Sequence, residues 1–148
     1  IVKKVRNIIE DTNIVIPNGS QMEISHHYGI GDFYNNGLIM FTIINKEYCK
    51  KILILLKNQT HPAQYHKIKR ETFHVLNGEL DLILDNVKKH VGVGEVITIE
   101  PNVVHEFSTK TGCVIEEISS NHQVNDSFYI DESISLNKNR KTLVNFWR

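Results

Sequence analysis

Turn-forming residues divide most of this chain into short apolar runs, and their regular spacing limits the folds that the chain can adopt. The dipeptides Asn77-Gly78, Asp85-Asn86 and Thr111-Gly112 each separate two runs rich in branched or aromatic residues. The run from Glu79 to Asp85 alternates, with leucines on one side and acidic residues on the other. Strands of about five residues at spacings near ten, without a long helical period, are typical of β-sandwiches and barrels. The sequence therefore predicts an all-β domain.

Two of these turns predict antiparallel hairpins. Asn-Gly is the strongest short signal for a two-residue type I′ turn, so Glu71 to Leu76 is expected to pair with Glu79 to Asp85. In the same way, Val104 to Ser108 is expected to pair with Cys113 to Ser119 across Thr111-Gly112.

The length of 148 residues suits one domain with a sizeable core. The core barrel is expected at about residues 37–120, with an N-terminal extension at 1–36 and a C-terminal tail at 121–148. Within the extension, Ile14 to Ile16 is a candidate strand, and Thr142 to Trp147 is expected to add a last strand. The chain begins with Ile1 rather than Met, so a longer polypeptide that contains this domain stays open.

Charge and composition exclude several classes of protein. The 17 basic residues balance the 17 acidic ones, so the basic excess of a nucleic-acid binder is missing. No apolar run approaches the ~20 residues that span a bilayer, and there is no signal peptide pattern. Cys49 and Cys113 fit no zinc or redox spacing and are expected to be buried thiols in a cytoplasmic protein. The lysines of Lys50-Lys51 and of Lys67, Lys69 and Arg70 are expected at solvated strand edges and turns.

Four side chains form a pattern suited to a divalent metal ion. Gln64 and His66 are two residues apart, so they share one face of a strand. Glu71 begins the next strand after a bend, and His105 follows a second break at Pro101-Asn102. Two imidazoles, one carboxylate and one carboxamide suit Mn²⁺, Fe²⁺, Ni²⁺ or Zn²⁺. Gln64 is a weaker ligand than histidine, so it either completes the site or holds a water or the substrate.

This spacing resembles the two cupin motifs, G-x₅-H-x-H-x₃₋₄-E-x₆-G and G-x₅-P-x-G-x₂-H-x₃-N. The first fits from His66 through Glu71 to Gly78, and the second from Gly94 to His105. The resemblance implies a cupin-type double-stranded β-helix, an antiparallel barrel or jelly roll of six to eight strands that pairs as a homodimer. The departures from the motifs are Asn58, Gln64, Glu100, Asn102 and Thr109, which replace glycine, histidine, proline, glycine and asparagine.

A second resemblance covers more of the chain. It looks like the cupin domain appended to some N-acetylneuraminate (nonulosonic acid) synthase-type proteins, which is in turn similar to D-lyxose isomerase-like cupins. The resemblance implies a role beside bacterial sialic-acid-like or cell-surface sugar biosynthesis, and an aldose–ketose isomerisation as the candidate reaction. The runs that carry it are His26 to Gly29, Glu47 to Lys51, His61 to Lys67, Glu71 to Leu76 and Asn139 to Thr142.

The tandem acidic residues Glu116 and Glu117 provide a candidate general base. Strand alternation turns one of them toward the barrel interior, and burial raises the pKa of a carboxyl group. We favour Glu117 as the inward residue, and the alternative is that the inward glutamate forms an ion pair with a lysine across the sheet. His61 is expected either at the cavity mouth or on the surface, His122 on the surface, and one of His26 and His27 at the barrel opening or in a turn.

The leading hypothesis is a metal-dependent isomerase or epimerase of a small sugar or sugar acid. Glu116 or Glu117 would move the proton, and the metal would act as a Lewis acid. Two alternatives stay open. One is a non-catalytic sugar-binding or regulatory cupin, which the lack of a general base inside the barrel would favour. The other is an Fe²⁺ oxygenase built on His66, Glu71 and His105.

Overall fold

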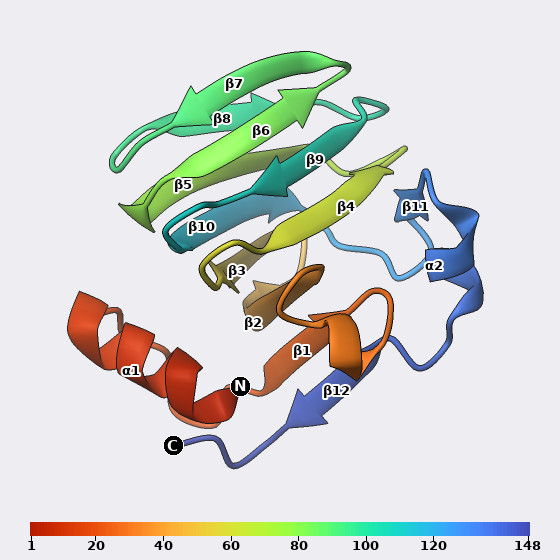
Figure 1. The fold of residues 1–148 in the computed structure, drawn as a ribbon. Helices are drawn as coiled ribbons and strands as arrows, with labels where there is room; N and C mark the ends of the chain where they lie inside the picture. The colour runs from red at the N-terminus through yellow and green to blue at the C-terminus, as the bar shows by residue number, and fades with distance from the viewer.

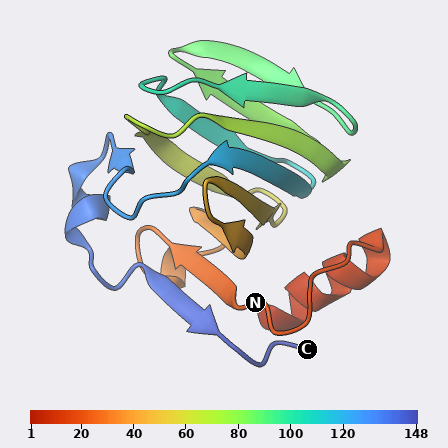
Figure 2. The same ribbon diagram turned by 180° about the vertical axis from the view of Figure 1, so that it is seen from behind.

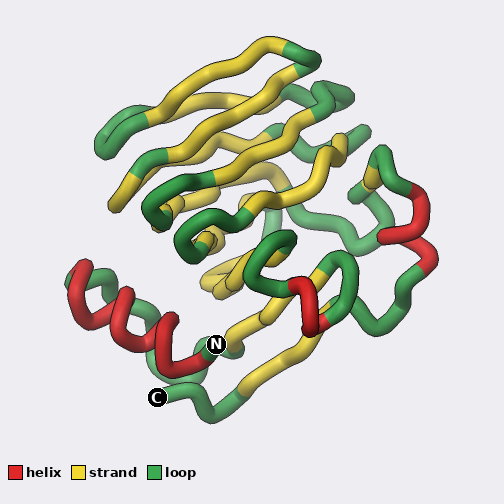
Figure 3. Tube along the Cα trace, viewed as in Figure 1, coloured by secondary structure: helices red, strands yellow, loops and turns green.

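The computed structural model describes all 148 residues, and it consists of two antiparallel sheets with little helix (Figures 1 and 3). The elements in chain order are α1 (Val2–Thr12), β1 (Met22–His26), the 3₁₀ helix η1 (Ile30–Asp32), β2 (Gly37–Asn45), β3 (Tyr48–Leu55), β4 (Thr60–Tyr65), β5 (Glu71–Gly78), β6 (Leu80–Leu84), β7 (Val87–Val91), β8 (Val96–Ile99), β9 (His105–Ser108), β10 (Cys113–Ser120), β11 (Phe128–Tyr129), α2 (Glu132–Leu136) and β12 (Lys141–Val144).

One sheet has the strand order β12-β1-β2-β3-β10-β5-β8, and the other has the order β11-β4-β9-β6-β7. The sheets face each other across a core of 12 buried residues that includes Leu53, Phe73, Leu82 and Phe107. The all-β prediction is confirmed. The predicted core barrel at residues 37–120 contains the nine strands β2 to β10, where six to eight were expected, and β1, β11 and β12 widen the sheets from both ends of the chain.

The two predicted hairpins were wrong. β5 pairs with β10 and β8, whereas β6 pairs with β7 and β9. The Asn77-Gly78 and Thr111-Gly112 turns therefore carry the chain from one sheet to the other. The true two-residue turn is Asp85-Asn86, where both residues have positive φ (44° and 66°), as a type I′ turn between β6 and β7 requires.

The two crossings touch each other. Gly78 has a φ of 74°, and a Cβ on it would collide with the carbonyl oxygen of Gly112. Cys113, the next residue, pairs with Gly78 in the register of β10 with β5. Glycine is thus required at position 78 for two reasons, the left-handed conformation and the close approach of a second backbone.

The N-terminal helix and the C-terminal residues build a second core on the outer face of the seven-stranded sheet. Val2, Val5, Ile8 and Ile9 recur at helical spacing, which places them on one face of α1. Trp147 packs against Phe41, with ring centroids 4.9 Å apart. Figures 1 and 2 show the two ends of the chain side by side near this core. Helix α1 was not predicted from the sequence, and the candidate strand at Ile14 to Ile16 is irregular.

Three smaller expectations were tested. Both cysteines are free and buried, as predicted. The last strand is present, but it is β12, which ends at Val144 rather than Trp147. Neither helix is long and apolar enough to cross a membrane.

The crossing at Gly78 generates a stability prediction. Gly78→Ala should lower the free energy of unfolding by on the order of 3 kcal/mol, because it adds a backbone collision to the cost of a left-handed alanine. Gly94→Ala is the matched control, since Gly94 also has positive φ (82°) but open space around its Cα. It should lose about 1 kcal/mol. Urea unfolding measures both, and equal losses would show that the contact with Gly112 is unimportant.

Candidate metal centre

Strand pairing brings three of the four predicted ligands to one point between the sheets. His66 follows the end of β4, and Glu71 is the first residue of β5 in the opposite sheet. His105 is the first residue of β9, which lies beside β4, and its Cα is paired with that of Gln64. The loop from His66 to Arg70 thus spans the two sheets and carries one ligand at its start, with Glu71 directly after it.

The side chains of His66, Glu71 and His105 are buried and in contact. One oxygen of Glu71, Oε1, lies 3.0 Å from His105 Nε2 and 3.5 Å from His66 Nε2. The other ring nitrogen of each histidine lies on a backbone carbonyl. His66 Nδ1 donates to Asp126 O at 2.7 Å, and His105 Nδ1 donates to Val103 O at 3.0 Å. A carbonyl can only accept, so both neutral rings carry the proton on Nδ1 and a lone pair on Nε2.

These three atoms fit a bound cation. His66 Nε2, His105 Nε2 and Glu71 Oε1 are buried and lack a hydrogen-bond partner. One ligand atom from each residue lies within 4.8 Å of the others. Lone pairs that face each other in a buried site repel unless a positive charge lies among them. Two imidazoles fixed by carbonyls, with one carboxylate, form a donor set that suits a transition-metal ion.

Gln64 lines the pocket beside these three residues and is 8% exposed. Its position on β4, paired with His105 on β9, directs it to the same region as the histidines. Its place as a fourth ligand stays a prediction.

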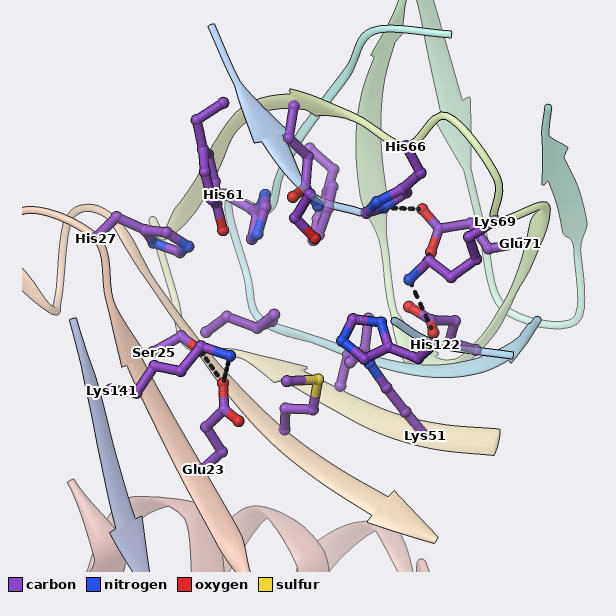
Figure 4. A pocket seen from close by; sticks show the side chains of 18 of the residues that line it. Glu23, Ser25, His27, Lys51, His61, His66, Lys69, Glu71, His122 and Lys141 are labelled. Atoms are coloured by element: carbon purple, nitrogen blue, oxygen red, sulfur yellow. Dashed lines mark hydrogen bonds and ion pairs between the residues drawn. The ribbon is translucent and has the colours of Figure 1, made fainter. Parts of the chain in front are cut away.

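A pocket of about 280 Å³ opens beside the three ligands. Figure 4 shows His66, Lys69 and Glu71 on one side of it and His27 and Glu23 across from them. The Lys69 ammonium lies between two buried carboxylates, 3.0 Å from Glu71 Oε2 and 3.6 Å from Glu117 Oε2. The pocket therefore combines the candidate ligands with a buried group of acids and bases.

Burial and charge move the pKa values of this group in different directions. Burial favours the neutral form of Glu71, but the Lys69 ammonium outweighs it and holds the pKa of Glu71 well below its usual value. Burial and the Glu71 charge together raise the pKa of Glu117. For Lys69, burial opposes the charge, yet Glu71 and Glu117 raise its pKa overall.

The two adjacent glutamates of β10 face opposite sides of the sheet. Glu117 is buried and lines the pocket, where it is paired across strands with Lys51 and Phe73. Glu116 faces outward and makes an ion pair with Lys50 at 3.2 Å. The inward glutamate is thus the one that the sequence analysis favoured, and its catalytic role is taken up below.

Two of the lysines that were expected mostly at solvated strand edges and turns are buried. Lys51 is 3% exposed and Lys69 is 4% exposed, and both line the pocket. Burial lowers the pKa of Lys51, although the Glu117 charge partly restores it. Strand alternation was the available signal for Lys51. In the structure Lys51 lies opposite the inward-facing Glu117 on the neighbouring strand, so both side chains face the pocket. Lys69 lies on a loop, where no periodicity applies.

Histidines form much of the remaining pocket wall. His61 lies on β4, is 4% exposed, and stacks on Phe107 with ring centroids 4.5 Å apart. His27 meets His61 edge to face at 4.7 Å, while His26 points away and contacts Thr142. His122 was expected on the surface, but it lines the pocket, and burial and nearby lysines lower its pKa to about 3.

The architecture and the comparisons agree on the fold. Residues 51–115 match the model of the cupin domain family. This segment runs from β3 to β10 and contains the three converging ligands. The chain has the cupin fold. Its seven-stranded and five-stranded sheets correspond to the two faces of the cupin jelly roll.

Two curated relatives align with this chain along nearly its whole length. The D-lyxose/D-mannose isomerase of Thermosediminibacter oceani is 27% identical over 90% of this chain and 91% of its own. The D-lyxose ketol-isomerase of a Thermofilum species is 26% identical over 89% of this chain and 90% of its own. Both relatives are named as sugar isomerases, and at this coverage the match reaches into both the N-terminal and the C-terminal extension.

Solved structures with the same fold extend across the whole cupin. The L-ribose isomerase of Geodermatophilus obscurus superposes with a TM-score of 0.74 at 11% identity and covers 91% of both chains. The Cellulomonas parahominis L-ribose isomerase with L-psicose gives 0.72 at 10% identity, with 90% and 91% covered. At this identity the likeness concerns the fold.

His27 makes stability depend on pH. Burial lowers the pKa of His27 from 6.5 to about 4, so the unfolded chain takes up a proton below about 6.5 while the folded protein does not. Stability should therefore fall as the pH drops from about 6.5 to about 4. Between pH 7.5 and pH 5 His27 should account for a loss on the order of 2 kcal/mol. Urea unfolding of wild type and His27→Gln at both pH values measures this difference.

The control is His90→Gln. His90 is exposed, and its hydrogen bond to Asp81 raises its pKa, so its contribution has the opposite sign. An equal acid loss in wild type and His27→Gln would contradict the role given to His27.

Proposed function

We propose that this cupin is a metal-dependent aldose–ketose isomerase that acts on a small sugar. The observation that carries the proposal is the convergence of three unpartnered lone-pair atoms, from His66, Glu71 and His105, beside the buried carboxyl of Glu117. The relatives named as isomerases of D-lyxose, D-mannose and L-ribose support the substrate class.

In this proposal, the three residues hold a divalent ion through His66 Nε2, His105 Nε2 and Glu71 Oε1. A bound ion would supply Lewis-acid stabilisation of negative charge on the sugar oxygens. Lys69 keeps Glu71 charged and in place, since the ammonium lies 3.0 Å from the oxygen that faces away from the histidines. Gln64 is the candidate fourth ligand or a hydrogen-bond partner of a sugar hydroxyl.

Glu117 is the group proposed to move the proton. Isomerisation removes the C2 proton of the aldose and returns a proton to C1, while a proton moves from the C2 hydroxyl to the C1 oxygen. A carboxyl group with a raised pKa suits this role, because its carboxylate is a stronger base toward the C2 proton and its protonated form holds that proton until it is delivered to C1. Lys69, 3.6 Å away, stabilises the charged form of Glu117 before the first transfer and after the second.

The pocket favours an enzyme over the two alternatives. A missing general base inside the barrel would have favoured a purely sugar-binding cupin, whereas the carboxyl group of Glu117 in the pocket wall supports an enzyme. The named relatives are isomerases, and none of these comparisons points to an oxygenase. The link to sialic-acid-like or cell-surface sugars, the cytoplasmic location and the homodimer stay predictions from the sequence.

Metal binding is the first test of the proposal. Glu71→Ala and His105→Ala should each weaken Mn²⁺ binding by more than about 100-fold, since even outer partners of metal ligands are worth 10–100-fold. His74→Ala is the control, because His74 lies on the same strand as Glu71 but pairs with Glu116 on the outer side. Metal content after dialysis and titration calorimetry give the result. Wild-type protein that holds no Mn²⁺, Fe²⁺, Ni²⁺ or Zn²⁺ would refute the metal centre.

The second test concerns the proton transfer. Glu117→Gln should lower kcat for ketose formation by about 10²- to 10⁴-fold, the usual contribution of a general acid–base group. Metal binding should be retained. Glu116→Gln is the adjacent control, since it removes only a surface ion pair, and its kcat should stay near the wild-type value. Assays with D-lyxose, D-mannose and L-ribose cover the substrates named for the relatives. Full activity of Glu117→Gln would exclude it as the base.

A further inference from the structure

Asp126 lies far from the cupin motifs in sequence but touches the candidate metal centre directly. It belongs to the segment between β10 and β11 and is 4% exposed. One carboxylate oxygen accepts the backbone N–H groups of Lys67 at 2.8 Å and Ile68 at 3.1 Å. The other accepts the N–H groups of Lys69 at 2.9 Å and Ile68 at 3.3 Å. One side chain therefore binds three consecutive amides.

These amides belong to the loop that joins two of the proposed ligands. The loop leaves β4 at His66 and enters β5 at Glu71, and it carries Lys69 into the pocket. Three successive N–H groups directed at one anion form a concave arrangement that fixes the backbone. Hydrogen bonds to a charged acceptor are also stronger than neutral ones. The carboxylate of Asp126 thus determines the path of the loop between the two sheets.

Asp126 also contacts the first ligand itself. Its backbone carbonyl accepts the Nδ1 proton of His66 at 2.7 Å, which leaves the Nε2 lone pair facing Glu71. The segment that contains Asp126 is held in turn against β4, since β11 pairs Tyr129 with Gln64 and Ile130 N donates to Ala63 O. The C-terminal tail therefore fixes His66 through the backbone carbonyl of Asp126, and it fixes the following loop through the carboxylate of the same residue.

We propose that Asp126 is a positioning residue that sets the metal affinity of the site by fixing the orientation of His66 and the loop that carries Lys69. This inference rests on the metal centre proposed above. A side chain that only attaches the tail to the barrel by hydrogen bonds would affect the stability of the fold but leave its metal affinity unchanged. Metal affinity therefore separates the two roles.

The test is Asp126→Asn, with Co²⁺ as the probe because its visible absorption reports coordination geometry. Asparagine keeps the shape but replaces one acceptor oxygen with a donor that opposes the loop amides. Co²⁺ binding should weaken by about 10- to 100-fold, the range found for outer-shell partners of metal ligands. The absorption spectrum of the bound Co²⁺ should change, and excess metal should restore most of the activity.

Asp131→Asn is the matched control. Asp131 lies in the same tail, and its carboxylate also accepts hydrogen bonds, from Ser133 N and from the Tyr28 hydroxyl. It has no hydrogen bond to the loop after His66, so Asp131→Asn should bind Co²⁺ like the wild type. Thermal unfolding of the metal-free proteins shows whether both variants fold.

The outcomes separate this inference from the proposed function. Wild-type binding of Co²⁺ together with unchanged affinity and spectrum in Asp126→Asn would overturn the role of Asp126 and leave the metal centre standing. Wild-type protein that binds no Co²⁺ would overturn both. If Asp126→Asn does not fold, Asp126→Glu decides. Its extra methylene displaces the carboxylate from the three amides, so weaker Co²⁺ binding supports the inference and wild-type affinity refutes it.

Discussion

Four ionisable side chains, Lys51, Lys69, Glu71 and Glu117, are buried between the sheets, and their mutual attraction is what allows the pocket to exist. Removing an isolated charge from water costs several kcal/mol even after the protein relaxes. Two ammonium and two carboxylate groups offset that cost only when they lie close together, as Lys69 does between Glu71 and Glu117. One need for positive charge remains, on the side of Glu71 away from Lys69. There the second carboxylate oxygen faces two imidazole lone pairs.

This arrangement explains how much of the site the sequence could predict. The spacing from Gln64 to Glu71 and on to His105 identified the candidate ligands, because short strands convert fixed spacing into fixed direction. Alternation also required one of Glu116 and Glu117 to face inward. Lys69 and Asp126 gave no such signal, since both lie outside regular strands and act through contacts with distant parts of the chain.

The fold, like the site, was predictable only in part. Turn residues and alternation were sufficient to predict an all-β chain. They also predicted a turn at Asp85-Asn86. A turn signal does not specify which strands pair, however. At Gly78 and Gly112 the chain changes sheets, and the contact between these two crossings is a property of the jelly roll as a whole. The helix α1 was not predicted although its apolar residues recur at helical spacing, because it has no side-chain cap and no acidic residue in its first turn to mark where it begins.

β12 has a consequence for the order in which the protein can be assembled. It pairs with β1, and β1 separates it from every other strand of its sheet. Because β12 is translated after all of these strands, β1 has an unpaired edge on the nascent chain until the tail emerges. Trp147, which covers Phe41, emerges later still. The outer core and the pocket wall formed by the tail can therefore close only when synthesis has passed Trp147, so the ribosome-bound chain exposes an edge that a chaperone or another nascent copy can engage.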